Sequence, residues 1–282
     1  MKKSIYLSKN LIKIVSSKLS CAGIEYEIKH QENGGTLYVE SENVQKCSDI
    51  LNEAREEEKK ISSILSTLSC EIVNKEKVDL NNVPYKKLIG ELVIVPLKKD
   101  GAIADCDFCR SIYQEPEDVL TEGMNYQRRF FIEKLDKLLR EVMQSMKFEE
   151  SYIDETLQMY GKDCPIWVLY SDPYRCGAVA LGTEWLLKIA HDNLKSNFYI
   201  LPSSKHEILI IPEKNATSLA AMEEMIQEVN KVEVSQNDIL CNQVFYFDGA
   251  ALQEAPETVG TSDIDVRRFT ELYSIFMRLR EI

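Results

Sequence analysis

Ser204 and His206 are the residues of this chain whose types and spacing could perform nucleophilic catalysis. A serine nucleophile needs a histidine within hydrogen-bond distance, and the histidine needs a carboxylate that orients it. Asp248, at the end of a predicted strand, is the carboxylate that we consider for this role. These three residues define one hypothesis, a hydrolase centred on Ser204 and His206.

The same stretch has a structural interpretation. Residues 198–212 contain two apolar runs separated by a Pro-Ser-Ser sequence, which predicts a β-hairpin with a turn between its strands. On an extended strand Ser204 and His206 share a face, whereas Glu207 points to the other face, so a triad within the segment is disfavoured. In this interpretation Ser203 and Ser204 bind the turn backbone, and His206 binds a neighbouring group.

A hairpin of this kind would position a binding surface rather than a catalytic centre. Ser203 and Glu207 are the candidate binding residues of the hairpin, and Trp185 and Met225 are those of the helices predicted beside it. The ligand that we expect for this surface is another protein.

A second candidate site is the C-x-x-C pair formed by Cys106 and Cys109. Two sulfur atoms at this spacing could hold a metal ion or cycle through a disulfide. The remaining cysteines and the three histidines provide no second pair at a familiar spacing. Metal or thiol-redox chemistry and a pair of ordinary thiols are therefore the two alternatives, and we expect no cofactor and no stoichiometric metal.

The elements that position the hairpin are predicted by hydrophobic periodicity. Beyond residue 165 the order is strand, helix, hairpin, helix and strand, which is typical of a compact α+β domain. A final helix follows, and Ser262 and Asp265 are placed before it as a capping box. Its apolar positions are Phe269, Leu272, Phe276 and Leu279.

The first part of the chain predicts a small α-β-β-α module. Ser8 can cap a first helix, residues 24–39 alternate as a hairpin, and a long second helix begins at Ser41. Residues 88–97 then predict a strand, 98–122 a loop that carries the cysteine pair, and 131–146 and 153–160 two helices.

The whole pattern predicts an α+β fold with three parts. Residues 1–74 form the adaptor-like module, and residues 75–164 contain the connector strand, the C-x-x-C loop and the long helices. Residues 165–282 form the α+β domain with the hairpin and the C-terminal helix.

Charge and cysteine usage restrict the partners and the compartment. The net charge is −12, from 46 acidic and 34 basic residues, which argues against direct binding to duplex nucleic acid. An acidic surface is suited to a basic protein partner, including one that normally holds nucleic acid. No apolar run approaches the ~18–20 residues of a membrane span, and eight scattered cysteines favour a reducing compartment, the cytoplasm.

Several segments, in order, resemble the C-terminal half of a family of unknown function that is widespread in gut Firmicutes and their mobile elements. The likeness covers about residues 165–250 and does not include the first 160 residues. It implies no activity. The matching segments are residues 177–180, 198–207, 225–230, 238–240 and 244–248.

Three hypotheses of different classes follow. The first is a non-enzymatic accessory or regulatory protein of a bacterial mobile element or phage, which acts through protein contacts; one version of it inhibits a host defence or nucleic-acid-binding complex. The second is the hydrolase centred on Ser204 and His206, and the third is the metal or thiol site at Cys106 and Cys109. A monomer and a homodimer both remain open.

Overall fold

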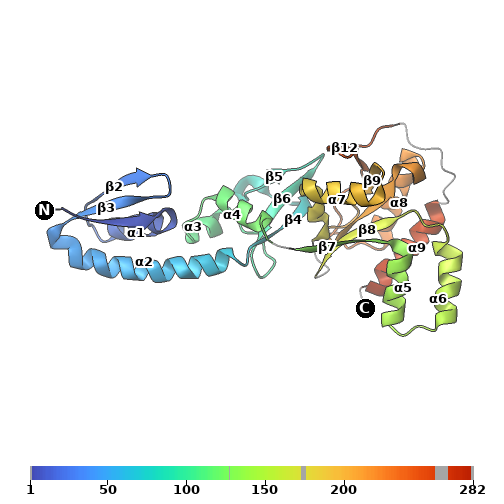
Figure 1. Ribbon diagram of the computed structural model, residues 1–282, viewed down its shortest axis with the longest axis horizontal. Helices are drawn as coiled ribbons and strands as arrows, with labels where there is room; N and C mark the ends of the chain where they lie inside the picture. Colours follow the sequence, from blue (N-terminus) through green and yellow to red (C-terminus); the bar gives the residue numbers. More distant parts are fainter. Residues whose placement is uncertain (1, 127, 173–175, 258–265, 281–282) are drawn as a thin grey trace. The chain divides into compact units, whose positions relative to one another are not determined.

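The computed structural model describes residues 2–126, 128–172, 176–257 and 266–280. It divides into two compact units, each containing helices and antiparallel sheets (Figure 1), so the predicted α+β fold class is confirmed. The division into three parts at residues 74 and 164 stays a prediction. The N-terminal unit consists of Met1–Ser69, Asn81–Pro84 and Pro96–Tyr126, and the C-terminal unit of Cys70–Leu80, Tyr85–Val95 and Gln127–Ile282.

The N-terminal unit contains the predicted hairpin and both predicted helices, together with one strand that the sequence reading missed. Leu7 is the one fully buried residue of that first strand, so its pattern carries little strand signal. Ser8 caps the first helix as predicted, because its Oγ accepts a hydrogen bond from the Leu11 N–H at 3.2 Å. The elements are β1 (Lys2–Ser8), α1 (Lys9–Cys21), β2 (Tyr26–Gln31), β3 (Gly34–Glu40) and α2 (Val44–Leu65), with the sheet order β1-β3-β2.

Two short helices of this unit replace the loop predicted for residues 98–122, which was wrong. They are α3 (Cys106–Ser111) and α4 (Pro116–Met124). Asp105 caps α3 by accepting the Phe108 N–H at 2.8 Å, and Pro116 occupies the first position of α4. Both are recognisable helix-start signals.

A six-stranded antiparallel sheet forms the centre of the C-terminal unit. The predicted hairpin is confirmed, since Leu201 pairs with Leu209 and Phe198 with Pro212. The sheet order is β12 (Leu252–Glu254), β11 (Phe245–Phe247), β9 (Phe198–Leu201), β10 (Glu207–Pro212), β8 (Trp167–Asp172) and β7 (Arg129–Lys134).

The strand β7 corrects the helix predicted from Phe131. Residues 129–134 pair with β8, and the helix begins only at Leu135. Within the described residues, no helix combines the length and apolar content that crossing a bilayer would require. Ser262 and Asp265, the predicted capping box, lie outside the described residues. The helices are α5 (Leu135–Ser145), α6 (Glu150–Thr156), α7 (Glu184–Leu194), α8 (Leu219–Val232) and α9 (Val266–Arg280), and a smaller sheet has the order β4 (Ser69–Asn74), β6 (Leu92–Leu97), β5 (Lys86–Lys87).

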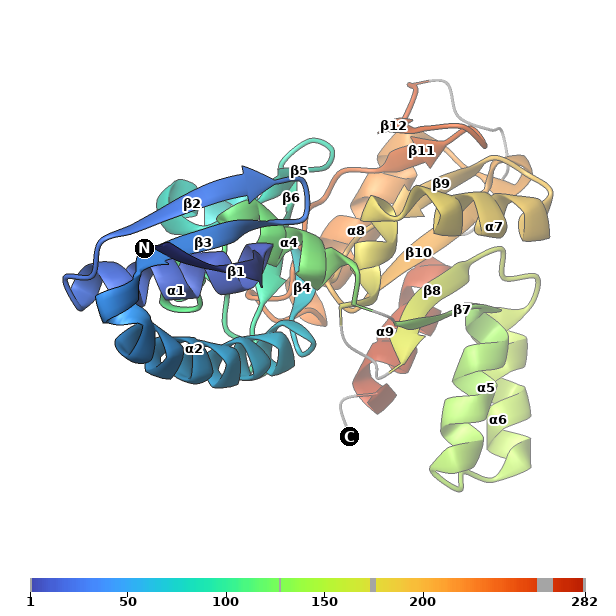
Figure 2. The ribbon, with the colours of Figure 1, turned by 60° about the vertical axis from the view of Figure 1, so that its left-hand side comes forward.

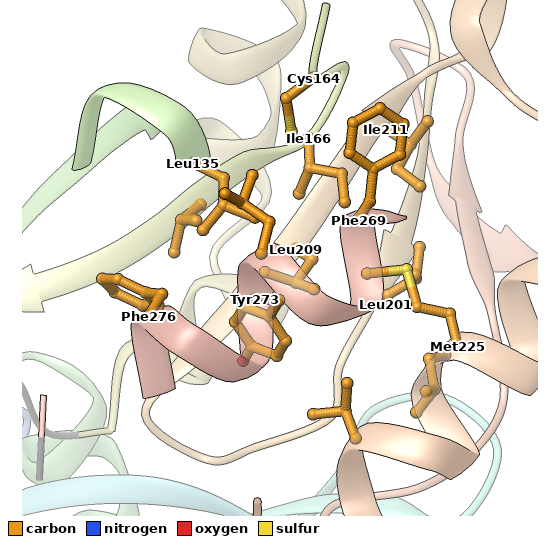
Figure 3. Packing of buried hydrophobic residues seen from close by; sticks show 14 of the residues in the cluster. Leu135, Cys164, Ile166, Leu201, Leu209, Ile211, Met225, Phe269, Tyr273 and Phe276 are labelled. Carbon is orange, nitrogen blue, oxygen red and sulfur yellow. The ribbon is translucent and has the colours of Figure 1, made fainter. Parts of the chain in front are cut away.

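Helices cover both faces of the large sheet. Side chains of α5, α8 and α9 pack against one face in a single hydrophobic cluster (Figure 3). The helix α7 lies close to β9 in both ribbon views (Figures 1 and 2), and it reaches the other face through an edge contact between the His191 and Phe247 rings. The short connection between β9 and β10 is therefore attached to a rigid, well-packed framework.

Candidate functional site

Residues 202–206, which we call the hairpin connection, are fixed by two other backbone segments. From one side, the Leu240 N–H donates to the Ser203 carbonyl at 3.1 Å. From the other, the Gly177 N–H donates to the His206 carbonyl at 2.9 Å. A Cβ atom at Gly177 would lie 2.2 Å from that oxygen, so the close approach requires glycine. The connection is thus held like a strand in a sheet.

Ser204 is fully buried, and its hydroxyl stabilises the turn. Its Oγ accepts a hydrogen bond from the His206 backbone N–H at 3.0 Å. Among the described residues, no hydrogen bond joins Ser204 Oγ to the His206 imidazole. The His206 ring is therefore not placed to accept the proton of the Ser204 hydroxyl, as activation of a serine nucleophile requires.

The His206 ring faces a carboxylate that the sequence reading did not select, that of Asp238. His206 Nε2 lies 3.5 Å from Asp238 Oδ2, and Nδ1 is buried without a hydrogen-bond partner among the described residues. Lys205 Nζ approaches the other oxygen of Asp238 at 2.8 Å. Burial raises the pKa of Asp238, but the hydrogen bond from Lys205 and the nearby His206 outweigh it, and the net shift is downward.

Glu71 and Cys176 complete what we call the Asp238 cluster, which comprises Glu71, Cys176, Lys205, His206 and Asp238. Glu71 Oε2 lies 3.6 Å from Lys205 Nζ and 3.7 Å from Cys176 Sγ. Burial raises the pKa of the Cys176 thiol to about 11, so the thiol is protonated at neutral pH. The cluster is an ion-paired group without an activated nucleophile.

A second polar group lies on the buried side of the connection. Glu207 is fully buried, and the Tyr273 hydroxyl donates to its Oε1 at 2.7 Å. Since that hydroxyl has one proton, Ser203 Oγ, 3.3 Å away, donates to the Tyr273 oxygen. Tyr273 belongs to α9 and stands inside the hydrophobic cluster (Figure 3). Ser203 and Glu207 therefore join the hairpin to α9 and do not line a binding surface.

Asp248, the carboxylate considered for His206, closes the turn between β11 and β12. Its Oδ1 accepts the N–H groups of Ala250 and Ala251, each at 2.8 Å. These two bonds hold the pKa of the Asp248 carboxyl below its usual range, and the bond from Ala251 has the larger effect. Among the described residues, no ion pair or hydrogen bond joins Asp248 to His206.

The two helical binding candidates have different environments. Met225 is packed in the hydrophobic cluster of α8, so it stabilises the core. Trp185, by contrast, is 60% exposed on α7, and Ile189 one turn later is 47% exposed. Of the two candidates, Trp185 is therefore the one in a position to contact a partner.

Cys106 and Cys109 lie in the first turn of α3. Cys109 is fully buried in the core of the N-terminal unit, and burial raises the pKa of its thiol to about 11. Both cysteines are free thiols. Within the described ranges, no group of three or more His, Cys, Asp or Glu side chains is arranged to hold a metal ion.

Sequence reasoning missed Glu71 and Asp238, and only one of them had a recognisable signal. Asp238 lies in one of the segments that carried the family resemblance. Glu71 lies between two buried residues of the short strand β4, a position without a distinctive pattern. Both reach the hairpin connection from distant parts of the chain, so spacing alone could not identify them.

Comparison with known proteins adds a family without an assigned activity. Residues 114–249 match the model of a family of unknown function (DUF5688), and the chain is similar to that family over this range. The match agrees with the resemblance noted in the sequence, but it begins at residue 114 instead of about 165 and leaves residues 1–113 outside. No curated protein and no solved structure matched the chain.

Proposed function

We propose that the protein is a non-enzymatic accessory or regulatory protein that acts by binding another protein through α7. The observation that carries the proposal is the exposure of Trp185 and Ile189, at 60% and 47%, on one side of this helix. Residues four apart on a helix are neighbours on its surface. We call the surface formed by these two side chains the α7 face.

Physical chemistry favours this face as a contact surface. An exposed tryptophan leaves a large apolar area in water, and tryptophan is enriched among the residues that dominate binding energies. Glu184 and Lys188, which form an ion pair at 2.5 Å, lie on the same helix and supply polar groups beside the apolar pair. An apolar centre with polar groups at its edge is the usual anatomy of a protein interface.

The arrangement of the hairpin connection supports the non-enzymatic part of the proposal. Ser204 Oγ is engaged with the backbone, and the His206 ring faces Asp238 through Nε2. In a serine hydrolase the carboxylate orients one ring nitrogen while the other faces the nucleophile. Here Ser204 makes no such contact, and the alternative hydrolase hypothesis therefore has less support.

We infer the class of the partner from charge. A net charge of −12 favours a basic partner, and a protein that normally holds nucleic acid is the class that we propose. A role in a bacterial mobile element or phage, with inhibition of a host defence complex, is the specific version of this proposal. A cytoplasmic location belongs to it as well, because that compartment would keep the eight free cysteines reduced.

The test compares capture of a partner by three versions of the full chain. A double variant, Trp185→Glu with Ile189→Glu, removes the apolar α7 face. Val232→Glu is the matched control, since Val232 is 63% exposed at the end of α8 in the same unit. Each version is used as bait in a lysate of the organism that encodes it, and the captured proteins are quantified by mass spectrometry.

We expect the wild type and the Val232 variant to retain the same basic protein and the double variant to lose it. Loss of a central tryptophan contact typically weakens binding by more than about 2 kcal/mol, roughly 30-fold. Equal retention by all three versions, with equal melting temperatures, would exclude the α7 face. Hydrolysis of a substrate that His206→Ala abolishes would instead support the hydrolase.

A further inference from the structure

A surface pocket in the C-terminal unit contains polar groups that neither the hairpin connection nor the α7 face uses. Its volume is about 350 Å³, and it lies where β7 ends, β8 begins and α7 ends. Small-molecule sites typically have volumes of about 300–1,000 Å³. The pocket therefore has the size for a small metabolite and is too small for a folded partner.

The charge of the lining is opposite to that of the chain as a whole. Lys134 and Lys214 line the pocket together with a single acidic residue, Asp163. Among the described residues, neither lysine forms an ion pair with a carboxylate; Lys134 Nζ lies 5.9 Å from the centre of the Trp167 ring. Two lysines against one aspartate make the lining positive in a chain of net charge −12, which favours an anionic ligand.

The remaining lining groups favour a ligand with more than one functional group. Asn193 and Asn215 also line the pocket, and an asparagine side chain offers both donors and acceptors. Asn193 belongs to the last turn of α7, where helix carbonyls without intrahelical partners attract hydrogen-bond donors. Trp167 forms an apolar wall. A ligand that complements all of these groups carries an anionic group together with hydroxyl or amino groups.

We infer that this pocket binds a small metabolite that bears a phosphate or carboxylate group together with hydroxyl or amino groups. Lys134 and Lys214 bind the anionic group, and Asn193 and Asn215 bind the polar groups. The site does not depend on the α7 face, and it would exist whether or not the protein binds a partner.

The test uses the fluorescence of Trp167. The chain has two tryptophans, so Trp185→Phe leaves Trp167 as the only one, and the replacement is on an exposed helix position. Glycerol 3-phosphate, serine and inorganic phosphate are titrated separately to about 10 mM, a limit that detects millimolar binding. Glycerol and sodium chloride at matched concentration and ionic strength are the controls.

We expect a saturable change of Trp167 emission with glycerol 3-phosphate or with serine, and the lower of the two dissociation constants shows which of these two ligand types the pocket prefers. Lys214→Gln and Lys134→Gln should each weaken this response by about tenfold or more, as expected for a lost hydrogen bond to a charged group. Lys188→Gln, on the same helix as Asn193 but outside the lining, should leave it unchanged.

Three outcomes would overturn the inference. One is the absence of a saturable response to all three probes. Another is an equal response to sodium chloride, which would indicate ionic strength alone. The third is equal ligand affinity in the wild type and in Lys214→Gln. Calorimetry is used for this comparison because it does not depend on the emission of Trp167, whose ring lies near Lys134.

Discussion

The hydroxyl of Tyr273 provides the most informative test of how the hairpin connection is held. Tyr273→Phe removes one oxygen atom and leaves the ring in the hydrophobic cluster. The lost hydroxyl is the donor to Glu207 Oε1 at 2.7 Å and the acceptor from Ser203. The variant thus weakens the link between the connection and α9 without creating a large cavity.

A matched control exists in the same sheet. The Tyr246 hydroxyl donates to Glu213 Oε1, also at 2.7 Å, but Glu213 is exposed whereas Glu207 is fully buried. Both tyrosine-to-phenylalanine changes remove a hydroxyl that donates to a carboxylate, and the two carboxylates differ in their access to water. Tyr273→Phe also removes the acceptor of the Ser203 hydroxyl, so the difference in stability reports the burial of Glu207 together with that second bond.

The magnitudes follow from hydrogen-bond energetics. A bond to a charged group typically contributes about 1.5–3 kcal/mol, and a buried carboxylate cannot replace the lost donor with water. We expect Tyr273→Phe to lower the free energy of unfolding by about 2–3 kcal/mol and Tyr246→Phe by about 0.5–1 kcal/mol. For a unit of this size these values correspond to melting temperatures lower by roughly 4–12 °C and 1–4 °C.

Urea unfolding followed by tryptophan fluorescence is the assay. Trp167 and Trp185 both belong to the C-terminal unit, so their emission reports the unit that contains both tyrosine sites and not the N-terminal unit. If Tyr273→Phe is no more destabilising than Tyr246→Phe, the buried Glu207 does not depend on Tyr273 and our description of the connection is wrong.

Three further predictions concern the surroundings of the connection and the cysteines. Gly177→Ala should destabilise the C-terminal unit by about 1–3 kcal/mol in urea, because the added methyl meets a carbonyl oxygen of the connection, while Gly182→Ala meets only the end of a flexible side chain and should cost less. Folding lowers the pKa of Asp238, so the stabilisation that its carboxylate provides is complete above its ordinary pKa and is lost as the pH falls. The difference in unfolding free energy between the wild type and Asp238→Asn should therefore shrink below about pH 4, and a difference that grows there would contradict this. In native protein at neutral pH the exposed Cys21 should react with a thiol reagent much faster than buried Cys109, whose pKa is raised to about 11, as mass spectrometry of the labelled peptides can show.

The sequence predicted those parts of the fold whose residues form long, strongly patterned runs. The hairpin at residues 198–212 and the helix α8 are fully buried on their inner faces, so their apolar pattern is unambiguous. The strands β1 and β7 were missed because they expose many of their side chains and have no regular alternation of buried and exposed residues.

The site was less predictable, because its contacts join distant segments. Nothing in the spacing of residues 198–212 indicates that Asp238 faces His206 or that Tyr273 binds Glu207. Asp248 had a local turn signal, since an Asp-Gly pair after a strand is a typical turn sequence. Its carboxylate binds that turn.

Partner retention and melting temperature, measured side by side for His206→Ala and Trp185→Ala, test the central claim most directly. We predict that Trp185→Ala loses the partner while its melting temperature stays close to that of the wild type. His206→Ala, which removes the Asp238 contact, should lower the melting temperature and retain the partner wherever the unit is folded. Loss of function in His206→Ala at an unchanged melting temperature, with full function in Trp185→Ala, would contradict the claim and indicate catalysis at the connection.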